Sequence, residues 1–176
     1  MNTYFTADPH FHHANIIKYC GRPFKDIKEH DEMLIVNWNS VVMPDDVIYI
    51  VGDFGFGDLE KILKRLNGTK ILVIGSHDKD TLKYSKYFDK ISPLIEVTIE
   101  GQPIVLCHYA MRVWGRSHYN SWHLYGHSHG RLESFGKSFD VGVDCHNFFP
   151  WSFKEVKQKM STLPDNFNLV KKAPVV

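Results

Sequence analysis

Two histidines, His127 and His129, stand two residues apart between Gly126 and Gly130, directly after an apolar run that includes Leu124. A strand that runs into such a glycine-flanked loop presents both imidazoles at the end of a sheet, where the backbone is free to bend around an ion. Neutral imidazole is the commonest side chain for holding a catalytic transition metal. The pair therefore indicates a metal site, although two surface histidines in a turn explain an isolated His-x-His equally well.

Potential metal ligands recur at the ends of the other segments that have the pattern of strands. The five sets are Asp8 with His10, Asp53, His77 with Asp78, His108, and His127 with His129. In an open α/β sheet the ligand crevice lies outside the carboxyl ends of the strands, so these side chains are expected to converge on one site. Independently placed histidines, the alternative explanation, would not be expected to recur at this structural position.

The number and chemistry of these donors predict a centre of two divalent ions. A catalytic zinc usually takes three protein ligands, and the set exceeds that number. Two ions about 3.5–4 Å apart and bridged by one carboxylate is the economical arrangement. Imidazole and carboxylate donors without cysteine favour Mn²⁺, with Fe, Zn²⁺, Ni²⁺ or Co²⁺ as alternatives, over Mg²⁺ or Ca²⁺.

The elements that must position these residues are strands alternating with helices. Strands are expected at 3–7, 47–51, 70–74, 94–100, 103–107 and 138–144, and one more directly before His127. Helices are expected at 26–42, at 58–66 and from 152 to about 160, with spacings typical of capping boxes at the first and last of these, and the polar stretch 79–90 is compatible with a helix. The strand–helix–strand order over 47–74 predicts parallel pairing, and Gly101-Gln102 predicts a hairpin.

Composition predicts a single globular domain over residues 1–176, with 164–176 as a loosely packed tail. Apolar residues make up 43% and charged residues 23% of the chain, as in ordinary globular proteins. The net charge of +1 gives no overall field that favours extended duplex nucleic acid or a membrane as partner. Three scattered cysteines fit free thiols, and the absence of a secretory pattern or a long apolar run predicts a cytoplasmic protein. We expect a monomer or small homo-oligomer.

In order and spacing, the five ligand sets resemble the motifs of the calcineurin-like metallophosphoesterases, including small bacterial and phage members. The resemblance spans residues 8–129 and implies an α/β fold, a four-layer α/β/β/α sandwich of two mixed sheets, with two metals at one sheet edge. It further implies that Asp8, His10 and His129 hold the first metal, that His108 and His127 hold the second, and that Asp53 bridges them. His77, oriented by Asp78, would then assist the leaving group or donate to the phosphate oxygens.

One position departs from the motifs of this family. Ser76 stands where the family usually has an asparagine whose side-chain oxygen ligates the second metal. Because serine is shorter and a weaker donor, we expect a lower affinity at the second metal. Three explanations stay open: a natural tolerance with a water in place of the amide, a weakened second site, or a substitution introduced to slow turnover.

The predicted mechanism is in-line attack on phosphorus by a metal-bridging hydroxide, with Asp53, His77 and Asp78 as the catalytic residues. A divalent ion lowers the pKa of bound water from about 15.7 toward about 7, so that hydroxide is available at neutral pH. A covalent mechanism through Cys107 and His108 is disfavoured, because adjacent residues on a strand face opposite sides.

Six residues outside the metal motifs are candidates for substrate binding, because arginine matches phosphate oxygens and aromatic rings offer a stacking face. They are His13, Asn15, Arg22, Arg112, Trp114 and His118. The arginines fit solvated loop positions equally well, and core packing is the stronger alternative for Trp114. Together they favour a phosphodiester of a nucleotide, a cyclic nucleotide or a short oligonucleotide. A phosphomonoesterase or nuclease with the same centre, and a weakly active or non-catalytic binding module, remain as alternatives.

Overall fold

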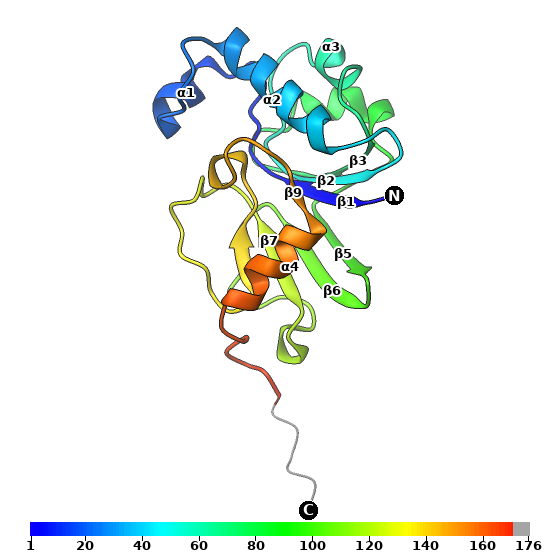
Figure 1. The fold of residues 1–176 in the computed structure, drawn as a ribbon, viewed down its shortest axis with the longest axis vertical. Helices are drawn as coiled ribbons and strands as arrows, with labels where there is room; N and C mark the ends of the chain where they lie inside the picture. Colours follow the sequence, from blue (N-terminus) through cyan, green and yellow to red (C-terminus); the bar gives the residue numbers. More distant parts are fainter. Residues whose placement is uncertain (171–176) are drawn as a thin grey trace, which may run out of the picture.

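Within residues 1–170, which the computed structural model describes, the chain forms two β-sheets that pack face to face (Figure 1). The first sheet has the strand order β4 (Lys90–Ser92), β3 (Thr69–Val73), β2 (Val47–Val51), β1 (Thr3–Thr6) and β9 (Trp151–Ser152). The second has the order β5 (Leu94–Ile99), β6 (Gln102–Cys107), β7 (Trp122–Tyr125) and β8 (Ser138–Asp140). The α/β fold of two mixed sheets expected from the sequence is thereby confirmed.

Strand direction brings the carboxyl ends of the functional strands to one edge. Strands β1 to β4 are mutually parallel and only β9 runs antiparallel to its neighbour β1. In the second sheet β6, β7 and β8 are parallel, and the predicted hairpin joins β5 and β6. A parallel bridge between Ala7 and Gly142 links the ends of β1 and β8. The loops after β1, β2, β3, β6 and β7 therefore open at one place.

The alternation of side chains along β2 explains why its apolar run is continuous. Tyr49 and Val51 point into the core between the two sheets, whereas Ile48 and Ile50 pack against the helices on the outer face. That outer face is covered by α2 (Ile27–Val41) and α3 (Glu60–Leu63). Helix α4 (Phe153–Thr162) adds the side chains of Phe153, Val156 and Met160 to the core between the sheets.

Of the two capping boxes predicted from the sequence, the structure forms one completely and one in part. Ser152 and Glu155 form a complete capping box at the start of α4, as predicted. At α2 the side chain of Asp26 accepts the Glu29 N–H, but the Glu29 carboxylate accepts the N–H of Lys25, so this box is incomplete. Helix α3 is shorter than the predicted 58–66, although its flanking residues Leu59 and Leu66 are buried as expected.

Several segments differ from the sequence-based prediction. The short helix α1 (Ala14–Cys20), which has no side-chain N-cap, and the short strands β4 and β9 were not expected. The stretch 79–90 contains the 3-10 helix η1 (Thr81–Tyr87), and two single turns follow later, η2 (Ser117–Tyr119) and η3 (Val143–Cys145). The predicted strand 138–144 ends at Asp140 because its Oδ1 accepts the Gly142 N–H, which turns the chain. Over residues 1–170 no helix combines the length and apolarity needed to cross a membrane.

Residues 164–170, predicted to be part of a loosely packed tail, are mostly exposed, but hydrogen bonds attach them to the domain. Asn166 is buried, its amide donates to the carbonyls of Ser117 and Ser121, and its Oδ1 accepts the Lys137 N–H. The sequence alone does not indicate these hydrogen bonds, because the partners of the Asn166 amide lie far away in the sequence. The remainder of the predicted tail, 171–176, lies outside the described residues.

Asn166→Ala is expected to lower the free energy of unfolding by about 2 kcal/mol, because it leaves buried backbone groups without hydrogen-bond partners. Urea denaturation measures this change. Phe167→Ala is the matched control, since Phe167 is 65% exposed and its loss should change stability by about 0.5 kcal/mol or less. Equal small effects of both substitutions would show that the segment contributes no packing.

Candidate metal centre

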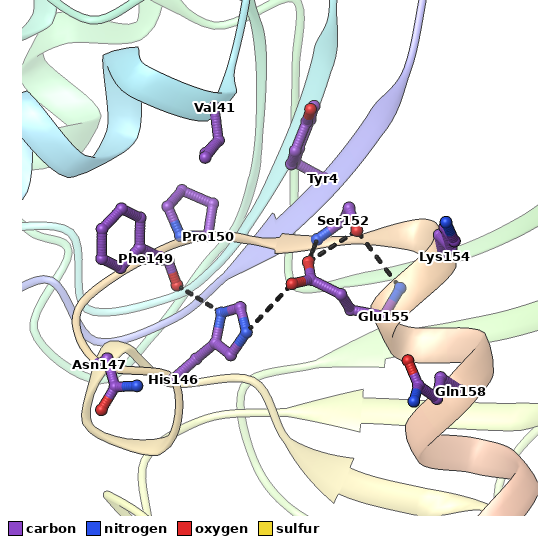
Figure 2. A pocket seen from close by; sticks show the side chains of 10 residues that line it. All are labelled: Tyr4, Val41, His146, Asn147, Phe149, Pro150, Ser152, Lys154, Glu155 and Gln158. Atoms are coloured by element: carbon purple, nitrogen blue, oxygen red, sulfur yellow. Dashed lines mark hydrogen bonds and ion pairs between the residues drawn. The ribbon is translucent and has the colours of Figure 1, made fainter.

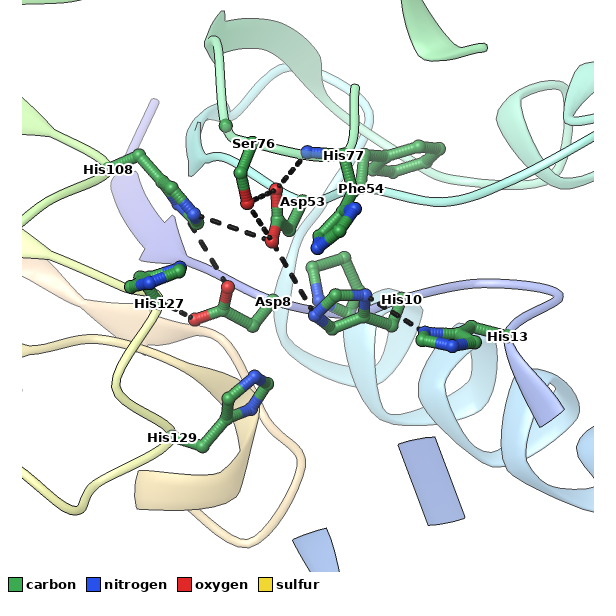
Figure 3. A network of polar contacts seen from close by, with 12 residues as sticks. Asp8, His10, His13, Asp53, Phe54, Ser76, His77, His108, His127 and His129 are labelled. Carbon is green, nitrogen blue, oxygen red and sulfur yellow. Dashed lines mark hydrogen bonds and ion pairs between the residues drawn. The ribbon is translucent and has the colours of Figure 1, made fainter. Parts of the chain in front are cut away.

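Six of the predicted ligands form two groups of three side chains, each group close enough to hold one ion. In the first group, donor atoms of Asp8, His10 and His129 all lie within 4.8 Å of one another. In the second group, the same holds for Asp53, His108 and His127. Figure 3 shows the groups side by side, with His108 and His127 on one side of the carboxylates and His10 on the other. The division matches the one that the family resemblance implies.

Asp53 lies between the two groups. Its Oδ2 is 3.4 Å from Nε2 of His108 in its own group and 3.7 Å from Nε2 of His10 in the other. Its Oδ1 accepts the backbone N–H of His77 at 2.8 Å, which fixes the carboxylate plane. A carboxylate in this position can reach two neighbouring ions, as the predicted bridging ligand must.

The donor set has the unpaired atoms that a metal site needs. Within the described residues, Oδ1 of Asp8 and Nε2 of both His10 and His108 are buried side-chain atoms without a hydrogen-bond partner. Such groups are costly unless something compensates them, and a bound cation would do so. Nδ1 of His108 donates to the Val51 carbonyl at 2.9 Å and leaves Nε2 as the metal-facing nitrogen, the arrangement usual for metal-ligating histidines. The residues present therefore fit a divalent ion.

Burial and neighbouring charges shift the pKa values of these groups strongly. Burial lowers the pKa of His10 to about 3, so its imidazole is neutral at pH 7. Burial also acts to lower the pKa of His108, but the close negative charge of Asp53 outweighs it and raises the pKa to about 9. Burial raises the pKa of Asp8 to about 7, whereas the pKa of Asp53 falls well below its usual range because His108 outweighs burial there. The ionisation of Asp8 and that of Asp53 therefore both depend on positive charge nearby.

The backbone at the site is held in a conformation that most residues avoid. Five of the six grouped ligands have φ in the left-handed region, between 49° and 66°: Asp8, His10, Asp53, His127 and His129. Non-glycine residues adopt this region infrequently, and such residues cluster at functional sites. Asp and His are among the side chains enriched there, so ligand chemistry and backbone geometry favour the same residue types.

Glycines before three of the motifs allow the loops to approach closely. A Cβ at Gly52 would overlap the ring of His108, and one at Gly75 would overlap the backbone nitrogen and Oδ1 of Asp53. A Cβ at Gly126 would lie 2.6 Å from Oδ2 of Asp8. The site is therefore packed so tightly that side chains at these positions would displace ligands.

Ser76 lies beside the second group. Its Oγ donates to the Asp53 carboxylate, at 3.1 Å from Oδ2 and 3.3 Å from Oδ1. The hydroxyl hydrogen therefore points at the Asp53 carboxylate, and Ser76 is itself exposed to solvent.

The structure corrects the role predicted for Asp78. Its carboxylate is buried and accepts three backbone N–H groups, from Asp53 and Gly75 on Oδ2 and from Phe54 on Oδ1, at 2.7–3.0 Å. All three bonds are to backbone groups, so Asp78 fastens the loop after β2 to the loop after β3. His77 has an exposed side chain that lines the cavity beside His10. The prediction paired Asp78 with His77 because the two are adjacent in the sequence, but the carboxylate of Asp78 bonds to backbone groups instead.

Asp144 is a contributor that the sequence analysis missed. Its Oδ2 accepts Nδ1–H of His129 at 2.7 Å and also the guanidinium of Arg22 at 2.7 Å, while Oδ1 accepts Nε–H of Arg22 at 2.8 Å. Burial opposes its ionisation, but the bonds from His129 and Arg22 lower the pKa of Asp144 to about 2. A carboxylate that orients a ligating imidazole is a common support of metal sites. The sequence analysis placed Asp144 at the end of a strand over 138–144, whereas that strand ends four residues earlier, at Asp140.

Arg22, predicted to contact substrate, is instead a buried structural residue. Its side chain is fully buried, and besides Asp144 it binds the backbone carbonyls of Asp8 and Pro9 and the ring of His30. All of this polarity is satisfied within the protein. The prediction is wrong because arginine is as well suited to several buried carbonyl and carboxylate partners as to a phosphate.

The other substrate candidates separate into one that reaches the centre and four that do not. A cavity of about 390 Å³ opens over the ligands, and His13 lines it. Trp114 is buried, with its Nε1–H bonded to the Ser121 carbonyl and its ring against His123, so its predicted stacking role is wrong. Arg112 lies over the ring of Phe135. Asn15 and His118 are exposed, and these two and Arg112 are not among the residues that line the cavity.

Five residues of that cavity were not singled out from the sequence. Ile16, Tyr19 and Cys20 come from α1, and Phe56 comes from the loop after β2; Arg131 follows the His129 loop. Because α1 itself was not predicted, nothing in the sequence except the nearby Pro9 and His10 indicated that its residues line the cavity.

A larger cavity of about 570 Å³ lies elsewhere, between the start of α4 and the end of α2 (Figure 2). It contains one imidazole and one carboxylate, and both are engaged. His146 Nδ1 donates to the Phe149 carbonyl at 3.2 Å, and its Nε2 lies 3.4 Å from Oε1 of Glu155. This donor set is too small for a metal centre, so the smaller cavity over the two ligand groups is the candidate site.

Comparison of the structure with solved structures identifies the fold. The chain superposes on a protein of unknown function, AQ665 from Aquifex aeolicus, with a TM-score of 0.70 and 28% identity, covering 90% of this chain and 98% of that one. It also superposes on a novel archaeal phosphodiesterase with a TM-score of 0.50 and 19% identity, covering 81% and 82%. At that identity the second match shows the fold alone, which is that of the calcineurin-like phosphoesterases.

The sequence comparisons place the chain in a family. It is 32% identical over 161 residues to the uncharacterized protein MJ1445 of Methanocaldococcus jannaschii, covering 85% of each chain. The chain belongs to the same family as that protein. The Gene 66 protein of Mycobacterium phage L5 is 35% identical over 83 residues, 44% of this chain and 40% of that protein. No family model matches the chain.

Gly75→Ala is expected to abolish tight metal binding, because the added methyl overlaps the backbone and carboxylate of Asp53. Calorimetric titration with Mn²⁺ measures the affinity, and circular dichroism checks that the variant is folded. Gly115→Ala is the matched control: neither glycine has a positive φ, but the Cβ at Gly115 meets only the flexible end of Glu96. Unchanged Mn²⁺ affinity in folded Gly75→Ala would contradict the tight packing of Asp53.

Asp78→Asn is expected to lower the free energy of unfolding by about 2–3 kcal/mol, since an amide NH₂ would replace an acceptor that faces backbone N–H groups. His77→Ala, at an exposed position, should change it by about 0.5 kcal/mol or less. Chemical denaturation distinguishes the two variants. If Asp78→Asn were as stable as the wild type, the role of Asp78 as a backbone fastener would be wrong.

Proposed function

We propose that this protein is a metal-dependent phosphodiesterase that hydrolyses a small phosphodiester of the nucleotide class. The observation that carries the proposal is the pair of facing three-residue groups, Asp8–His10–His129 and Asp53–His108–His127, in which three buried donor atoms, Oδ1 of Asp8 and Nε2 of both His10 and His108, lack hydrogen-bond partners within the described residues. The expected ions are Mn²⁺ in both sites, with Fe, Zn²⁺, Ni²⁺ or Co²⁺ as alternatives. The fold adds support, because a phosphodiesterase shares it.

The roles of the residues follow from their positions. Two divalent ions, when bound, would supply hydroxide at neutral pH and neutralise charge on the phosphoryl oxygens. Asp53, between the groups, is placed to bridge them, and Asp144 holds the imidazole of His129 in one orientation. His77 stands free at the cavity wall, where its ring can donate a proton to the leaving oxygen or a hydrogen bond to the phosphate.

Ser76 sets the expected strength of the second site. Its hydroxyl donates to Asp53 rather than offering a lone pair toward the ion, and it is too short to take the place of an asparagine amide directly. We propose that the chain is a small bacterial or phage type of metallophosphoesterase in which this substitution weakens the second metal site. Asparagine at this position would restore a neutral oxygen ligand.

Aromatic side chains on two sides of the ligands favour a diester over a monoester. Tyr109, half exposed, lies 4.9 Å from the ring of His127, and Phe56 lies 6.2 Å from the ring of His10. Both ester arms of a diester would then have an aromatic neighbour, whereas a monoester needs only one. We propose a small cytoplasmic phosphorylated compound as substrate and a monomer or small homo-oligomer as the active form. A phosphomonoesterase or nuclease using the same centre is the second candidate.

The test combines metal content with turnover of two model substrates. In added Mn²⁺, the protein is expected to hydrolyse bis-p-nitrophenyl phosphate and to leave p-nitrophenyl phosphate almost untouched. Ser76→Asn is expected to bind close to two ions per chain by elemental analysis and to turn over at least about tenfold faster, because it adds a ligand to the second site.

His127→Asn removes a ligand of the second group and should lower turnover by about 100-fold or more. His146→Asn is the matched control, because His146 lies in the separate cavity of Figure 2 and should leave turnover unchanged. Hydrolysis of the monoester alone would favour the second candidate. No turnover of either substrate by the wild type and Ser76→Asn in Mn²⁺ would exclude both enzymatic functions.

A further inference from the structure

A row of aromatic rings leads from the metal ligands to the outside of the cavity. We call Phe56, His13 and Tyr19 the aromatic wall. The ring of His10, a ligand of the first group, is 5.3 Å from that of His13. The ring of His13 is 4.7 Å from Phe56 and 6.2 Å from Tyr19. All three wall residues line the cavity over the metal centre, together with Ile16.

The aromatic wall contributes little to the core of the protein. Tyr19 is 62% exposed, and neither it nor Phe56 belongs to the two hydrophobic core clusters of the described residues. Exposed aromatic surface beside a catalytic centre has a cost in water that a bound ligand would remove.

Arg131 closes the same cavity from the opposite loop. It follows directly on the His129 loop, and one of its terminal N–H groups donates to the Tyr19 carbonyl at 2.5 Å, at the end of α1. That bond ties α1 to the loop that carries a metal ligand. It uses one of the five N–H donors of the guanidinium, and the described structure assigns no partner to the other four. A phosphate oxygen in the cavity could receive them in pairs.

We propose that the aromatic wall is a subsite for a flat aromatic ring on one ester arm of the substrate, and that Arg131 binds an oxygen of the phosphate that carries this arm. The inference rests on the proposed phosphodiesterase function and names the chemistry of the bound arm. A cavity of about 390 Å³ accommodates one ring and one phosphate, which corresponds to a mononucleotide-sized aryl or nucleobase-bearing diester. Aromatic stacking is tolerant of which base or aryl group it receives, because each has a π face.

The experiment compares two diesters that differ only in the arms. Calorimetry on the Mn²⁺-loaded protein measures the dissociation constants of diphenyl phosphate and diethyl phosphate, both of which have poor leaving groups. The wild type is expected to bind the diphenyl ester about tenfold or more tightly than the diethyl ester, in the range measured for ring stacking. In Tyr19→Ala and in Phe56→Ala this ratio should fall to about threefold or less, with the metal content unchanged.

Arg131→Ala is expected to weaken the binding of both diesters by a similar factor, because it removes a contact to the phosphate and not to the ring. Two variants serve as controls for these substitutions. Tyr119→Ala removes a tyrosine that is 70% exposed and does not line the cavity. Arg65→Ala removes an exposed arginine that pairs with Glu32 on another surface. Both should keep the affinities and the ratio of the wild type.

Outcomes that contradict the inference differ from those that contradict the function. Equal binding of the two diesters by the wild type, or a ratio that survives in Tyr19→Ala and Phe56→Ala, would overturn the aromatic subsite. If bis-p-nitrophenyl phosphate were still hydrolysed, the phosphodiesterase function would stand without it. Binding of neither diester by the Mn²⁺-loaded wild type would overturn the subsite, and the absence of turnover would then separately overturn the function.

Discussion

Hydrogen bonds from backbone amides to buried carboxylates hold the whole site together. Each carboxylate sits in one loop and accepts N–H groups from another. Asp8, after β1, accepts the N–H of His127, and Asp140, at the end of β8, accepts that of Gly130. Asp53 and Asp78 do the same reciprocally between the loops after β2 and β3. Of these bonds, the one from His127 to Asp8 crosses between the two sheets, and the others tie together loops of one sheet. Hydrogen bonds to ionised carboxylates are roughly twice as strong as neutral ones.

These bonds also offset the unfavourable backbone conformation of the ligands. A residue held in the left-handed region costs about 1–3 kcal/mol, and five ligands share that conformation. The strain persists only where the surroundings determine the backbone, and here the ends of strands in two sheets do so. The same constraint explains why the loops before Asp53, Ser76 and His127 begin with glycine, since a Cβ there would push a ligand out of place.

The sequence predicted those parts of the site that are local in the chain. Strand β2 was recognisable from its continuous apolar run, and the acid that follows it lies where strand ends converge. The pairing of Asp144 with Arg22 could not be predicted, because 122 residues separate them in the sequence and neither belongs to a local pattern. The role of Asp78 was wrong for the opposite reason: its neighbour His77 offered a local partner, whereas its bonds go to the backbone of Gly75 and of another loop.

Helix α1 contributes both to the support of the metal ligands and to the lining of the cavity over them. At its end, Arg22 binds the backbone of Asp8 and the carboxylate of Asp144, which orients His129. Arg131 fastens the last turn of the same helix from outside. The contacts that support the ligands thus involve the end of α1, whereas the wall residue Tyr19 projects from its exposed side. In the proposed subsite, substitutions on that exposed side would change which substrate arm is accepted without moving a ligand, so that the choice of substrate would be separate from the chemistry.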